Sequence, residues 1–234
     1  MHWLERAASE RRVGDSFALV ANALTALHAP DELTALARRA VDDEVRHQGL
    51  SFLVAQRFFG HPIAPPARLP FAPPAHRNAS PSLRHRLHIL GQCALNETSA
   101  TAVLEASLAE ATGALAKSAL RELLADEVEH ARIGWGFLGT LSAEERAAVQ
   151  PWLFALVHGN MRTWRDTERA YPSDDSLVAH GAISRSLLER ALQLALRDLI
   201  IPGFKQLGFD TAEIERWAQA GAPTDGSFVP QETA

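Results

Sequence analysis

The 234-residue sequence contains a single cysteine, Cys93, and this scarcity excludes several kinds of site. One cysteine cannot close a disulfide within the chain, nor can it supply the ligands of a cysteine-rich zinc site or an iron–sulfur cluster. Basic residues do not exceed acidic ones: there are 23 Lys and Arg against 28 Asp and Glu, and the net charge is −5. Because nucleic-acid-binding surfaces depend on a basic excess, we expect no nucleic-acid partner.

Long apolar runs are missing as well. No stretch approaches the roughly 18 uninterrupted apolar residues that mark a membrane-spanning helix. The first residues, Met1 to Arg6, lack the charged-then-apolar layout of a secretory signal peptide. We therefore expect a protein of the reduced cytoplasm, without a membrane partner.

The alternating β-branched pattern of strands is nearly absent, whereas Ala, Leu, Arg and Glu dominate. This composition and the apolar periodicity predict an all-α fold. The expected helices cover residues 4–28, 31–59, 82–111, 114–141, 143 to beyond 164, 183–201 and 212–220. Pro151 is expected to kink or interrupt the fifth of these, and Pro202-Gly203 to end the sixth.

Seven of the thirteen prolines lie in residues 60–81, which indicates an extended connection. Such a segment is either a disordered linker between domains or the long crossover of a four-helix bundle. We favour the crossover. The prediction is one helical domain over residues 1–220 and a flexible tail at 221–234, with a loop at Tyr171–Asp174.

The pentapeptide Asp43-Glu44-Val45-Arg46-His47 recurs as Asp126-Glu127-Val128-Glu129-His130. Each copy contains Glu-x-x-His inside a predicted helix. Residues three apart project from one helix face, so the carboxylate and the imidazole of each copy can bind one metal ion from the same side. Each copy also lies in the second arm of a predicted helical hairpin.

The first arm of the second hairpin carries a matching carboxylate, Glu97. Glu97 and Glu127 lie about 15 residues on either side of the turn near Thr112, so they should meet at one height on antiparallel helices. Both share a face with apolar residues. We therefore expect both carboxylates to point into the core.

In the first hairpin, two residues of the first arm could supply the matching carboxylate. Glu10 shares a face with Phe17 and Leu24, whereas Asp15 matches the height of Glu44 better but points to the opposite side. The direction in which the side chain points is the stronger constraint, because a tilt of the helices can compensate for a difference in height along them. Glu10 is favoured, and Asp15 stays open.

Burying four carboxylates among apolar side chains costs free energy unless a cation binds them. Two divalent ions would balance their charge, and mixed imidazole and carboxylate ligands suit Fe, Mn or Zn better than Mg or Ca. Asp43 and Asp126 are natural acceptors for the second N–H of the histidines, across the bundle.

These paired motifs resemble the ferritin-like diiron-carboxylate superfamily. More narrowly, Cys93–Thr98 and Asp126–Ala131 are similar to motifs of bacterial ferritin-like domain proteins, and the resemblance covers roughly residues 3 to 210. It implies a four-helix bundle with one long Pro-rich crossover and about two C-terminal helices. It also implies two Fe ions, or Mn and Fe, with O2 as co-substrate.

The resulting hypothesis is a non-haem diiron oxidase or oxygenase that oxidises or hydroxylates a small-molecule substrate. Its expected partners are an external electron donor and a second copy of the chain in a homodimer. The alternatives are a ferroxidase or iron-handling protein and a metal-free helical interaction bundle. The expected catalytic and metal-binding residues are Glu10, Glu44, His47, Glu97, Glu127 and His130.

Overall fold

The computed structural model describes residues 2–68, 70–166 and 175–220, and every regular element in these ranges is a helix. No strand occurs in them, which confirms the all-α prediction. The loop expected at 171–174 and the tail expected at 221–234 lie outside the described residues.

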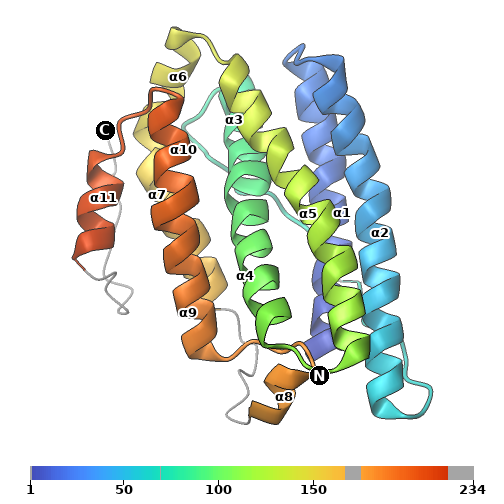
Figure 1. Cartoon of the computed structure of the whole chain (residues 1–234). Helices are drawn as coiled ribbons and strands as arrows, with labels where there is room; N and C mark the ends of the chain where they lie inside the picture. The colour runs from blue at the N-terminus through green and yellow to red at the C-terminus, as the bar shows by residue number, and fades with distance from the viewer. Residues whose placement is uncertain (1, 69, 167–174, 221–234) are drawn as a thin grey trace.

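Four long helical stretches pack side by side (Figure 1). Helix α1 (His2–Ala26) lies along α2 (Asp31–Phe59), and α2 packs on α5 (Ala114–Thr140). The fourth stretch is continuous but irregular, and it contacts both α5 and α1. It consists of α3 (Pro81–Ile89), a π-helical segment η1 (Leu90–Asn96) and α4 (Glu97–Glu110).

The remaining helices cover one flank of this group, against α4 and η1. Pro151 interrupts the helix after Ser142, as predicted, because a 3-10 turn replaces the α-helix there. The elements are α6 (Ala143–Val149), the 3-10 turn η2 (Gln150–Trp152), α7 (Leu153–Arg165), α8 (Asp175–Ala179), α9 (Arg185–Leu194), a second π-helical segment η3 (Ala195–Ile200), α10 (Ile201–Gln206) and α11 (Ala212–Gln219).

The prediction that Pro202-Gly203 ends the sixth helix was wrong. The helix passes from α9 through η3 into α10, and Pro202 lies in the first turn of α10. In a regular α-helix a proline removes a backbone hydrogen bond and clashes with the preceding turn. The wider π segment directly before Pro202 shifts the hydrogen-bond register, so the proline takes a first-turn position, where it is tolerated.

The connection between α2 and α3 contains neither helix nor strand among its described residues. Arg68 binds the carboxylate of Asp15 on α1 at 2.7 Å, and the ring of Phe71 lies against His88 of α3 with 6.1 Å between centroids. The segment is therefore anchored along α1 and α3.

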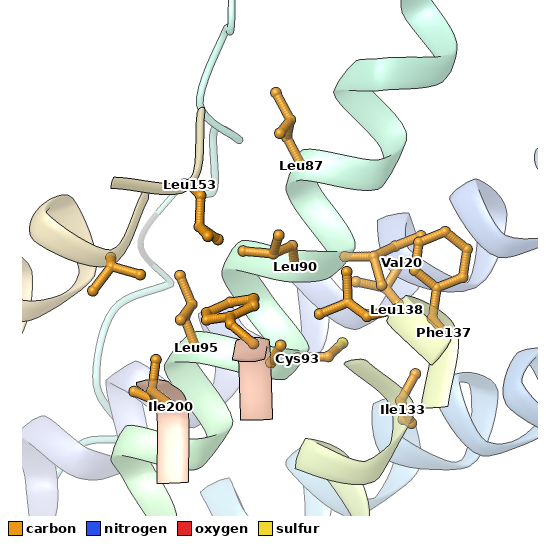
Figure 2. Close-up of a cluster of buried hydrophobic side chains, with 14 of the residues drawn as sticks. Val20, Leu87, Leu90, Cys93, Leu95, Ile133, Phe137, Leu138, Leu153 and Ile200 are labelled. Carbon is orange, nitrogen blue, oxygen red and sulfur yellow. The ribbon is translucent and has the colours of Figure 1, made fainter. Parts of the chain in front are cut away.

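Two apolar clusters fill the space between the long helices. Figure 2 shows the larger one, in which Cys93 lies among apolar side chains such as Leu90 and Leu138. The smaller cluster contains Trp3 and Leu120. Cys93 is fully buried, as expected of a core cysteine.

The predicted site residues lie between these two clusters. Along α5, Leu123 belongs to the smaller cluster and Ile133 to the larger. Glu127 and His130 stand between them in the chain. On α1 the smaller cluster also comes first, and on α2 the larger one does, with the site residues between them in both cases. A polar layer therefore crosses the interior between two apolar layers.

Within the described residues, no helix is both long enough and apolar enough to cross a membrane.

Candidate metal centre

The π-helical segment η1 determines where the Glu97 side chain is held. Gln92 donates a hydrogen bond to Glu97 Oε1, and Asn96 Nδ2 donates to the same oxygen at 3.2 Å. Gln92 is itself fixed by Ser16 Oγ of α1, which donates to its Oε1 at 2.6 Å. Residues five apart are about 140° apart around an α-helix. The π turn brings Gln92 and Glu97 to one side, so sequence spacing did not reveal this contact.

All six predicted residues are buried. Glu44 and His47 have no exposed surface, and Glu10 is the most exposed at 7%. Four of the six form a compact group, because one ligand atom from each of them lies within 4.8 Å of the others. These four are Glu44, Glu97, Glu127 and His130.

Both histidines direct Nδ1 at the glutamates. His130 Nδ1 lies 3.1 Å from Glu127 Oε2 and 3.3 Å from Glu44 Oε1. His47 Nδ1 lies 3.5 Å from Glu127 Oε1 and 3.6 Å from Glu44 Oε2. The two Glu-x-x-His motifs thus converge on one centre.

The opposite ring nitrogens contact aspartates across the helix pair, as the sequence predicts. His47 Nε2 lies 3.0 Å from Asp126 Oδ2, and His130 Nε2 lies 3.4 Å from Asp43 Oδ2. Arg46 donates hydrogen bonds to both aspartates. With Nε2–H donated to a carboxylate, each imidazole can present Nδ1 as the ligand atom.

The counterpart of Arg46 in the second motif is Glu129, which pairs with Arg132 near the surface. The arrangement around the histidines is therefore asymmetric. The bridging role of Arg46 was not predicted, because it depends on how α2 and α5 are placed relative to each other.

Burial and neighbouring charges shift the pKa values of the buried glutamates in different directions. Burial and nearby charges, that of Glu44 first, raise the pKa of Glu10 to about 7. Burial and the charge of Glu127 raise the pKa of Glu97 well above its usual range. Burial also acts on Glu127, but a hydrogen bond from His130 and the nearby His47 ring outweigh it and hold the pKa of Glu127 well below its usual range.

The histidines hold protons in the metal-free cluster. Burial disfavours the charged imidazole, yet the neighbouring carboxylates of Glu127 and Glu44, at 3.5 and 3.6 Å from Nδ1, raise the pKa of His47 to about 12. The same partners raise the pKa of His130 to about 11. At neutral pH both rings therefore carry the positive charge that a metal ion would replace.

Three buried atoms of the cluster have no hydrogen-bond partner within the described residues: both carboxylate oxygens of Glu44 and Nδ1 of His47. The Glu44 oxygens have only ion-pair contacts with the histidines, at 3.3 and 3.6 Å, and a buried charged oxygen without a hydrogen bond is costly. Divalent cations would satisfy these atoms, and two of them would balance the four carboxylates. Carboxylate oxygens and imidazole nitrogens are ligands that suit Fe, Mn and Zn. The residues present therefore fit a transition-metal centre.

The two candidates on α1 have different environments. Glu10 is buried, and the charges of Glu44, Glu127 and His47 influence its carboxyl group. Asp15 instead pairs with Arg68 of the connecting segment, and its side chain is 25% exposed. Of the two, Glu10 faces the cluster, since it lines the same cavity as Glu97 and Glu127, but it is not one of the four residues of the compact group.

Replacing Glu10 with Ala is therefore expected to weaken metal binding by at least about tenfold, because loss of even an outer partner of a metal ligand costs about that much. Asp15→Ala should change the affinity by less than about threefold, since it removes only an exposed ion pair. Competition with a chelator of known affinity would measure both. A larger effect of Asp15→Ala would assign the ligand to Asp15.

Metal binding should release protons. His47 and His130 hold protons at pH 7 in the metal-free chain, and Glu10 does so in part. All three must lose them to bind metal, so about two to three protons per chain should appear and affinity should rise with pH. Calorimetry in two buffers of different ionisation enthalpy would count them. Release of fewer than about one proton would contradict the protonation of the cluster described above.

A cavity of about 440 Å³ adjoins the cluster, and Glu10, Glu97 and Glu127 form part of its wall. A scan against models of known protein families and a search of the curated proteins each find no match to this chain.

Proposed function

We propose that this chain is a ferritin-like protein that holds two iron ions, or one manganese and one iron ion, and uses O2 to oxidise or hydroxylate a small molecule. One observation carries the proposal: a buried cluster of carboxylates and imidazoles with orphaned ligand atoms adjoins a cavity of substrate size. The residues that would hold the metal pair are Glu10, Glu44, His47, Glu97, Glu127 and His130.

The helix arrangement supports the ferritin-like part of the proposal. Helices α1 and α2 form one pair, α4 and α5 form another, and the segment 60–80 joins the two pairs (Figure 1). In the proposed bundle this segment is the long crossover, and the helices after α5 are the C-terminal additions. Bundles of this topology place Glu and Glu-x-x-His ligands on facing helices, pointing inward.

When bound, reduced iron would supply the electrons that O2 accepts, and an external donor would restore them. The protein's part is to bind and orient. Asp126 and Asp43 accept the Nε2 protons of His47 and His130, which directs each Nδ1 at the centre. Gln92 holds the Glu97 carboxylate. The apolar layers above and below limit access of water.

Anaerobic titration with Fe(II) tests the proposal. Binding should saturate at about two ions per chain, because six side chains divide between two metal positions. After exposure to O2, the iron should stay soluble, remain bound at this ratio and be reducible again, in a monomer or homodimer.

The alternatives predict other results. An iron-storage protein would continue to take up iron into a mineral, in a large shell-like assembly. A metal-free interaction bundle would bind neither Fe(II) nor Mn(II). Either result would overturn the proposed oxidase function. The apolar wall of the adjoining cavity, to which Phe71 and Trp164 contribute, favours an organic substrate over iron alone.

A further inference from the structure

The cavity beside the cluster has an uneven charge distribution. Among the described residues, its acidic lining residues are Glu10, Glu97 and Glu127, and its basic ones are Arg6 and Arg12. All three glutamates belong to the proposed metal centre. Two divalent ions would neutralise the four carboxylates of that centre, so the loaded cavity would keep the positive charge of the two arginines.

Arg6 lies at the cavity, and its one carboxylate contact among the described residues is a long ion pair with Glu10. Its side chain is 11% exposed, its guanidinium lies 5.7 Å from the centroid of the Trp3 ring, and its Nη1 lies 3.8 Å from Glu10 Oε1. Its buried Nε has no hydrogen-bond partner within the described residues. Burying a guanidinium with unsatisfied donors is costly, and an anion in the cavity would offset that cost.

Arg12 lies further along α1 and is exposed. It forms no ion pair with any carboxylate in the described part of the chain. Both arginines line the same cavity, and guanidinium donors match the geometry of a carboxylate.

The rest of the wall is largely apolar. Val13 comes from α1, Phe71 from the segment between α2 and α3, and Trp164 from α7. A ligand that satisfies both parts of the wall needs an anionic end and a carbon body. Inorganic phosphate would satisfy the arginines alone, and an uncharged hydrocarbon would satisfy the apolar side chains alone.

We infer that the cavity binds a small organic carboxylate, anchored by Arg6 and Arg12, with its carbon body against Phe71 and Trp164. This inference rests on the proposed function, because it names the substrate class of the same centre. It predicts recognition of the carboxylate group itself, independently of turnover.

Calorimetry on the zinc-loaded protein tests the inference without turnover, because Zn(II) is redox-inactive. The probes are phenylpropionate, the uncharged phenylpropanol and inorganic phosphate. Phenylpropionate should bind at least about tenfold more tightly than either of the others, since it alone satisfies both parts of the wall. Equal binding of the acid and the alcohol would overturn the inference, and so would phosphate binding as tightly as the acid.

Variants of α1 assign the effect to the arginines. Arg12→Gln should weaken phenylpropionate binding about tenfold and leave phenylpropanol unchanged. Arg11→Gln is the matched control, because Arg11 is the neighbouring residue of α1 and does not line the cavity. Equal effects of the two substitutions would overturn the inference.

The zinc content of the same samples separates this inference from the proposed function. Normal zinc uptake without a preference for the acid would overturn the substrate class and leave the metal centre standing. If no metal binds, the proposed function fails. The same titrations on the metal-free protein then decide the inference, through the difference between Arg12→Gln and Arg11→Gln.

Discussion

Replacing His47 or His130 with Ala is expected to lower the bound metal per chain by at least about half, and replacing both should nearly abolish it. Each imidazole directs Nδ1 at the glutamates from its own helix, so each would serve one ion. Helix content should stay close to that of the wild type, because the apolar layers on either side of the cluster are untouched. Elemental analysis after Fe(II) loading, with far-ultraviolet circular dichroism, measures both effects.

His61→Ala is the matched control, since His61 is exposed and its Nδ1 lies 3.0 Å from the neighbouring carbonyl oxygen of Pro62. This variant should bind as much metal as the wild type. Unchanged metal content in both His47→Ala and His130→Ala would reject the site. A loss of helix content in step with the loss of metal would instead show that the histidines are needed for folding.

Replacing Gly134 with Ala should destabilise the protein by about 3 kcal/mol, the upper part of the range for overpacked cores. A Cβ atom there would overlap the backbone of Cys93 and Ala94 in η1. Backbone atoms of a packed helix cannot move aside as a flexible side chain can. For a chain of this length the melting temperature should fall by roughly 6–12 °C.

Gly139→Ala tests the same helix without the overlap. Its new Cβ would meet Leu207 Cδ2 at 3.9 Å, an ordinary van der Waals contact. Since Ala favours a helix over Gly by about 0.5–1 kcal/mol, this variant should be as stable as the wild type or slightly more so. Equal melting temperatures for Gly134→Ala and Gly139→Ala would show that α5 and η1 do not pack as closely as described.

The sequence alone predicted the parts of the centre that follow from regular helix geometry. Glu-x-x-His places Glu44 beside His47, and Glu127 beside His130, wherever an α-helix forms. Equal distances from one turn placed Glu97 opposite Glu127, because antiparallel helices rise equally per residue. Apolar periodicity likewise identified the helical fold and the buried face of Glu10.

Other features depended on contacts between residues far apart in the chain. The close packing of Gly134 against η1 brings α5 onto a segment whose π register places Gln92 beside Glu97, and no local pattern encodes that register. A π-helical segment also precedes Pro202, and the helix continues past this residue although the sequence predicted a helix end there.

The cavity was also decided only by the tertiary structure. Arg6 of α1, Phe71 of the connecting segment and Trp164 of α7 meet there although they are distant in the sequence. Periodicity reports which face of a helix is buried, because backbone geometry repeats along it. It does not report which partner covers that face, and this depends on how whole helices pack against one another.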